Sequence, residues 1–145
     1  MLTTKIVSLP LYVSLHFVVS TILQQLSNEK STMETFQNDV IQQSAVRPVI
    51  VDFWADWCGP CKQLVPILEK LTTEAKGAFC LVKVNVDQCP EIAGAFGVQS
   101  IPFVVAMLDG QPVSQFAGVK AEAELRKWLK SFMPSPAAEA FEQGQ

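Results

Sequence analysis

Two cysteines separated by two residues carry the clearest potential for chemistry in this chain. Cys58 and Cys61 follow an apolar segment, residues 48–54, and stand where a helical pattern begins. The aligned backbone dipoles and free N–H groups of a helix N-terminus stabilise a thiolate relative to a thiol, so Cys58 is expected to be the more reactive sulfur. Because Cys61 lies within reach of Cys58, the pair is suited to thiol–disulfide exchange.

The same pair could instead form a structural disulfide or half of a zinc site. A zinc site needs a second pair of ligands, but Cys80 and Cys89 are separated by eight residues, and the single histidine, His16, lies near the N-terminus. Covalent haem attachment requires a histidine directly after the second cysteine, where this chain has Lys62. We therefore expect neither a metal ion nor a cofactor.

The composition favours a reactive over a structural cysteine pair. With 145 residues, 49% of them apolar, the chain can build one packed domain without disulfide cross-links. Its net charge of −3 and the lack of any basic stripe argue against a nucleic-acid-binding surface.

Periodic apolar residues and turn signals predict alternating helices and strands. We expect helices at 35–44, 58 or 59–76, 91–96 and 120–132, and strands at 48–54, 79–86, 102–108 and 112–116, with no strand before residue 36. Pro66 should kink the second helix and Gly77 should end it, while Asp109-Gly110 should form a hairpin turn. A parallel β-α-β unit followed by a hairpin and a helix predicts an α/β fold in which helices sandwich a central mixed sheet.

The two ends of the chain differ from its centre, so we divide the chain into three segments, residues 1–32, 33–133 and 134–145. Residues 6–23 carry no charge, and three interpretations remain open for the first segment: a cleaved signal, a membrane anchor, or a mispredicted start upstream of Met33. The last segment begins with Pro-Ser-Pro and is predicted to be a flexible tail.

Between residues 36 and 132 the chain resembles the thioredoxin family. The run from Trp57 to Lys62, Trp-Cys-Gly-Pro-Cys-Lys, is a complete match to the family's active-site motif, and Asp52, Ile101-Pro102 and Gly118 match it independently. Residues 63–64, 92–94 and 99–102 further resemble the chaperone-associated branch, in which tetratricopeptide repeats follow the domain. The sequence ends where such repeats would begin, so the resemblance implies either a shortened relative or a fragment. The resemblance implies a thioredoxin fold and a protein-disulfide reductase, with a redox-linked holdase as the alternative.

The resemblance implies catalytic roles for four residues. Cys58 would attack the substrate disulfide, and Cys61 would resolve the mixed disulfide. Asp52, expected beneath the pair on its strand, would accept the proton of Cys61, because burial raises the pKa of a carboxyl group. Lys83 would be the charged neighbour of Asp52. Without the resemblance, Asp52 could be a solvated carboxylate at a strand end and Lys83 a surface lysine.

The resemblance also implies a flat surface for substrate binding. A cis bond before Pro102 would turn the backbone N–H and C=O of Ile101 toward the sulfurs, where they could pair with an extended substrate. Trp54 would support the site from the core. The residues expected on this surface are Trp57, Gly59, Pro60, Ile101, Pro102 and Gly118.

The remaining expectations concern the other cysteines and the partners. Cys80 should be an inert core thiol, and Cys89 an exposed thiol in a loop, most simply an idle one. The implied partners are protein disulfides, a thioredoxin-reductase-like electron donor and, through the branch resemblance, a chaperone. We expect a cytoplasmic protein, or a membrane-anchored or periplasmic one if residues 1–26 are retained.

Overall fold

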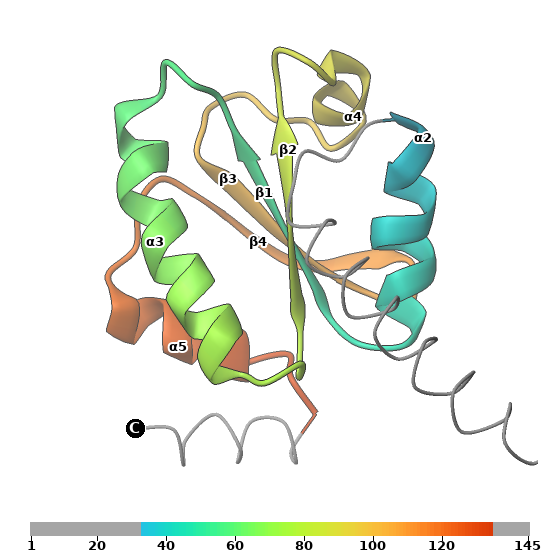
Figure 1. The fold of residues 1–145 in the computed structure, drawn as a ribbon, viewed down its shortest axis with the longest axis vertical. Helices are drawn as coiled ribbons and strands as arrows, with labels where there is room; N and C mark the ends of the chain where they lie inside the picture. Colours follow the sequence, from blue (N-terminus) through green and yellow to red (C-terminus); the bar gives the residue numbers. More distant parts are fainter. Residues whose placement is uncertain (1–32, 135–145) are drawn as a thin grey trace, which may run out of the picture.

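Four strands form a mixed sheet with helices on both faces in the computed structural model, which describes residues 33–134 (Figure 1). The strands are β1 (Val49–Trp54), β2 (Cys80–Asn85), β3 (Phe103–Leu108) and β4 (Gln111–Ala117), and their order across the sheet is β2-β1-β3-β4. β1 pairs parallel with β2 and antiparallel with β3, and β3 pairs antiparallel with β4. The predicted α/β fold with a central mixed sheet is therefore confirmed.

The helices lie within two residues of the predicted ranges: the first helical stretch is slightly longer, the third helix is shifted by one residue, and the second and fourth are shorter. The first helical stretch changes type along its length, from α2 (Met33–Phe36) through the π-helical η1 (Gln37–Gln42) to the 3-10 turn η2 (Gln43–Ala45). It is followed by α3 (Gly59–Glu74), α4 (Pro90–Ala95) and α5 (Glu122–Lys130). α3 continues through Pro66 and gives way to Lys76 and Gly77 in the left-handed conformation, so the helix ends shortly before the predicted glycine.

Alternation along β1 divides the core into two halves. Ile50 packs with the leucines of α3 and α5 on one face of the sheet, whereas Val49, Val51 and Phe53 pack on the other face with residues of η1 and α4. Asp52 shares the parity of Ile50, so it belongs to the face covered by α3 (Figure 1).

The predicted hairpin turn is present and is tied to the first helical stretch. Asp109 and Gly110 have φ values of 49° and 75°, the pair of positive φ angles that a two-residue hairpin of type I′ requires. The Gly110 N–H donates to Ser44 Oγ at 2.8 Å, and the Asp109 N–H donates to the Ser44 carbonyl at 2.9 Å. The buried Ser44 therefore links residues far apart in the chain.

Three expectations concern segments outside the described residues. The signal, anchor or false-start interpretations all fall on residues 1–32, and the flexible tail falls almost entirely on residues 135–145. Within residues 33–134, no helix combines the length and apolar character needed to cross a bilayer. The prediction that no strand precedes residue 36 also falls almost entirely on residues 1–32 and stays a prediction; the first strand of the described range is β1.

Candidate redox site

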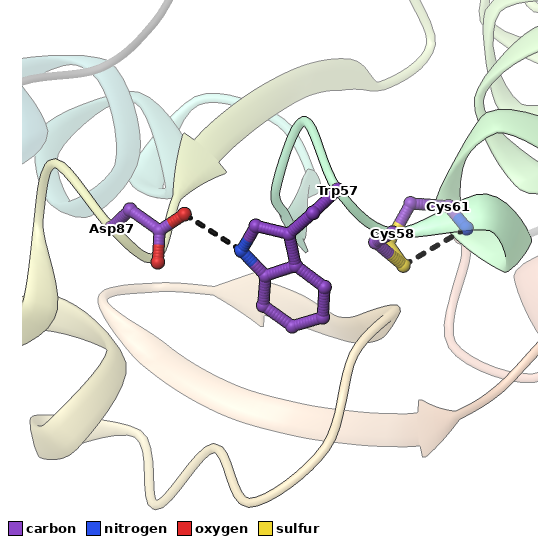
Figure 2. The surroundings of a disulfide bond; sticks show 4 residues. All are labelled: Trp57, Cys58, Cys61 and Asp87. Atoms are coloured by element: carbon purple, nitrogen blue, oxygen red, sulfur yellow. Dashed lines mark hydrogen bonds between the residues drawn. A yellow bond between two sulfur atoms is a disulfide. The ribbon is translucent and has the colours of Figure 1, made fainter.

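Cys58 and Cys61 are joined by a disulfide at the N-terminus of α3 (Figure 2). Cys58 is the N-cap residue in an extended conformation, and Gly59 and Pro60 open the helix, where the missing N–H of proline costs no hydrogen bond. The Cys61 N–H donates to Cys58 Sγ, with nitrogen and sulfur 3.2 Å apart. The first sulfur therefore receives a hydrogen bond from one of the free N–H groups at the helix start, which stabilises negative charge on it.

Apolar contacts hold the cysteine pair almost fully buried. Cys58 is 3% exposed and Cys61 1% exposed, and both pack with Ala55. Trp54 of β1, Val86 after β2 and Ile101 of the loop before β3 pack against this small cluster. Trp54 thus supports the site from the core side, as expected. In such a low-dielectric setting the helix N-terminus acts more strongly on a thiolate than it would in water.

Asp52 lies in the middle of β1 and is fully buried. Burial raises the pKa of its carboxyl group to about 7; Lys83 opposes this effect, and Glu69 adds to it. No donor among residues 33–134 forms a hydrogen bond with either carboxylate oxygen. A carboxyl group that titrates near neutral pH can both take up and release a proton under working conditions.

Lys83 is the register partner of Asp52 across β1 and β2, but its ammonium binds elsewhere. Lys83 Nζ lies 2.8 Å from Glu69 Oε1 of α3. Lys83 also lines, with Cys61 and Lys62, a pocket of about 280 Å³ whose other walls are mostly apolar.

Glu69 was not predicted from the sequence. The signal that could have indicated it is a carboxylate two turns beyond Cys61, on the helix that covers Asp52.

Trp57 projects from the loop before the cysteines and is 70% exposed. Its indole N–H donates to Asp87 Oδ2 at 2.8 Å (Figure 2). The Asp87 N–H in turn donates to Asn85 Oδ1 at 2.9 Å, an Asx-type turn at the end of β2. Asp87 was also missed; its place two residues after a parallel strand, where site residues commonly lie, is the available signal.

The loop before β3 comes close to the cysteine pair through Ile101. The Ile101–Pro102 bond is cis, as the resemblance implies, and the Gly118 N–H donates to the Pro102 carbonyl at 2.8 Å. Gly118 has a φ of 84°, a conformation that costs glycine little. Trp57 and Ile101 line a second pocket of about 170 Å³, together with Val86, Ala93, Val98, Gln99 and Ser100.

The structure therefore gathers most of the predicted surface residues around one end of α3. Gly59 and Pro60 are exposed, Ile101 and Gly118 are half-buried, and Pro102 is buried behind them. Within the described range 33–134, no three His, Cys, Asp or Glu side chains are grouped so that they could hold a metal ion.

The exposure predicted for Cys89 was wrong, whereas Cys80 packs against the core as predicted but is not fully buried. Cys89 is only 4% exposed, because it is the N-cap of α4 and the apolar side of that helix draws it against the sheet. Cys80, predicted to be a core thiol, is half-buried at the first position of β2. Burial raises the pKa of both thiols, so neither is activated as a nucleophile.

Comparisons with known proteins agree with this geometry. The family model described as thioredoxin matches residues 27–131. The thioredoxin of Mycobacterium tuberculosis is 43% identical over 106 residues, which are 73% of this chain and 90% of that protein. The thioredoxin of Streptomyces clavuligerus is 45% identical over 94 residues, 65% of this chain and 85% of that protein.

A fusion protein is also similar. The bifunctional thioredoxin reductase/thioredoxin of Mycobacterium leprae is 39% identical over 120 residues, 80% of this chain and 26% of that protein. These relatives favour disulfide reduction over the holdase alternative, and the resemblance to the chaperone-associated branch still rests on its three short segments alone. Since the family model spans most of the chain and the cysteine pair of its motif is closed into a disulfide at a helix start, this chain belongs to the thioredoxin family and is a thiol–disulfide oxidoreductase that reduces protein disulfides.

Proposed function

We propose that Cys58 and Cys61 divide the reduction of a protein disulfide between them. The Cys58 thiolate attacks one sulfur of the substrate disulfide, forms a mixed disulfide and expels the other sulfur as a thiolate. Cys61 then loses its proton to Asp52 and attacks the Cys58 sulfur, which releases the second substrate thiolate. Two electrons pass to the substrate, and the Cys58–Cys61 disulfide is left.

The position of Cys58 as N-cap of α3 is the observation that carries this assignment. Its sulfur accepts the Cys61 N–H and sits at the positive end of a 16-residue helix, whereas Cys61 lies within the first turn. A negative charge is therefore stabilised on Cys58 more than on Cys61. Asp52 supports the proton-acceptor role through its pKa of about 7, and Lys83 modulates that carboxyl group through its charge.

Alkylation of the reduced protein tests the order of the two thiols. With limiting iodoacetamide near neutral pH, we expect Cys58 to be modified first, because its sulfur lies at the N-terminus of α3, where a thiolate is stabilised. Peptide mass spectrometry after short reaction times gives the order directly. Faster modification of Cys61, or of Cys80 or Cys89, would contradict the assignment.

We infer that substrates bind beside the cysteines as extended chains. The exposed Trp57, Gly59 and Pro60, the backbone of Ile101 next to cis-Pro102, and Gly118 would form the contact surface. The backbone N–H and C=O of Ile101 would pair with the substrate in the manner of an added strand. The pocket of about 170 Å³ between Trp57 and Ile101 is then available to a substrate side chain.

A reductase of the thioredoxin-reductase type is the electron donor we propose. The Mycobacterium leprae relative supports it, because its name joins a thioredoxin reductase to a thioredoxin in one protein. A cycle that ends with an oxidised pair needs such a donor in every turn, and a reducing compartment such as the cytoplasm provides it. We extend the proposal neither to a chaperone partner nor to a membrane.

We also propose that residues 33–133 form the complete thioredoxin domain. Deletion of residues 1–32 should leave a protein that unfolds cooperatively and reduces insulin at the full-length rate, because the sheet, both core halves and the cysteine pair lie downstream. Thermal unfolding and insulin turnover of the two forms measure this. Aggregation or a much lower Tm would mean that residues 1–32 supply part of the fold.

A further inference from the structure

The ion pair between Lys83 and Glu69 stands out because Lys83 does not bind Asp52, its direct neighbour on the adjacent strand. Asp52 and Lys83 are directly paired residues of adjacent parallel strands, so their side chains leave the sheet on the same face. Yet neither Asp52 oxygen receives a hydrogen bond from any described residue, whereas the Lys83 ammonium lies 2.8 Å from Glu69 Oε1. One cation thus faces two carboxylates and binds the more exposed of them.

We propose that Glu69 is a positioning residue for the redox reaction: it holds the Lys83 ammonium on α3 and thereby keeps Asp52 from forming an ion pair. This inference deepens the proposed role of Asp52 as proton acceptor and rests on it. An ion-paired Asp52 would remain a carboxylate well below neutral pH and would be a weaker base toward Cys61.

The burial of the three groups supports a competition for the lysine. Asp52 is fully buried, the Lys83 side chain is 22% exposed, and that of Glu69 is 52% exposed. The buried carboxylate would gain more from the lysine than the exposed one, but only if the ammonium could turn inward. Glu69, from the helix that covers this face, gives the ammonium a partner in the direction of solvent.

The charges facing Asp52 come from two of the elements packed against it. β2 contributes Lys83, and α3 contributes Glu69, with Lys62 on the wall of the pocket that Lys83 and Cys61 also line. From β3 the register partner is the apolar Val104. The two cysteines are joined in the oxidised protein and do not titrate. Lys83 and Glu69 are therefore the charges that should control the titration of Asp52.

The test is an NMR titration of the Asp52 side-chain carboxyl carbon in the oxidised full-length chain. In Glu69→Gln we expect the midpoint to fall by about one pH unit, at the low end of the effect of an opposite charge close to a carboxylate. Glu74→Gln is the matched control, since Glu74 is another paired carboxylate of α3 but binds Arg126 at 2.7 Å. It should leave the Asp52 midpoint in place.

A double-mutant cycle separates positioning from simple repulsion between carboxylates. Removing Glu69 also removes a negative charge near Asp52, and that direct effect persists when Lys83 is absent. If Glu69 acts by holding Lys83, Glu69→Gln should shift the midpoint less than half as far in the Lys83→Met background as in the parent. An equal shift in both backgrounds, or no shift in the parent, overturns the inference.

Catalysis supplies an independent readout. The pH profile of insulin reduction should move to lower pH in Glu69→Gln along with the NMR midpoint, a change that a merely structural role of Glu69 would not produce. Failure of the proposed function would look different: Asp52→Asn would then turn over normally, while the carboxyl midpoint would still respond to Glu69. If the NMR midpoint shifts in Glu69→Gln but its pH profile of insulin reduction stays that of the parent, the catalytic part of the inference is overturned.

Discussion

Cys58→Ser is expected to abolish the reduction of insulin disulfides, while Cys61→Ser stops the cycle one step later. Loss of the attacking sulfur removes the covalent step, so turnover should fall by at least about 10³-fold, on the scale seen when an enzyme loses its nucleophile. In Cys61→Ser the first attack still proceeds, and the mixed disulfide accumulates because no second thiol resolves it. Mass spectrometry after mixing with a disulfide peptide should detect this adduct.

Cys80→Ser is the matched control for these variants. Cys80 is half-buried at the start of β2, outside the cysteine cluster at the helix start, and should be dispensable. Its serine variant should reduce insulin at the parental rate. An adduct on Cys58→Ser, or none on Cys61→Ser, would mean that the order of attack proposed for the two cysteines is reversed.

Asp52→Asn is expected to raise the free energy of unfolding and to slow the reduction of insulin. The carboxyl group has its ordinary pKa of 3.8 in the unfolded chain and a pKa of about 7 in the folded one. Between these pH values the folded protein holds a proton that the unfolded chain has lost, so parental stability falls as the pH rises from about 4 to about 7. Above about pH 7 the penalty is constant and on the order of a few kcal/mol, because each tenfold change in an acid dissociation constant corresponds to about 1.4 kcal/mol.

Denaturant unfolding at several pH values measures this penalty. The asparagine amide carries no charge to desolvate, so Asp52→Asn should be more stable than the parent by a margin that grows from about pH 4 to pH 7 and then levels off. A pH-independent difference would contradict the buried, titrating carboxyl group. Lys83→Met should act in the opposite direction and lower stability above about pH 7, since it removes the cation that partly compensates Asp52.

The same Asp52→Asn variant should reduce insulin more slowly, because Cys61 loses its proton acceptor. We expect a decrease of about tenfold near pH 7, smaller than the 10² to 10⁴ that a positioned general base commonly contributes, since hydroxide and buffer bases also accept the proton. Equal rates for the parent and Asp52→Asn from about pH 6 to pH 8 would remove Asp52 from the mechanism.

Local patterns were sufficient to predict the fold and the central chemistry. The apolar run of β1, the leucine spacing of α3 and the Asp109-Gly110 turn each depend on neighbouring residues, so they were readable from the chain alone. The Cys58–Cys61 pair was also predictable, because its reactivity derives from its place at a helix start. The cis bond before Pro102 was different: it came from the family resemblance, since the local preference of an X-Pro bond is for trans.

Exposure and pairing across elements were decided only by the tertiary structure. Cys89 precedes a proline in a connecting segment, which indicates a surface position, yet the docking of α4 on the sheet buries it. Asp87 receives the Trp57 N–H, and Glu69 binds Lys83, across separations of 30 and 14 residues. The sequence alone therefore determined which residues could do the chemistry and which elements would carry them. The partner of Lys83 was decided by the packing of α3 on β2, because hydrogen bonds and charges act through distances in space that local sequence patterns do not contain.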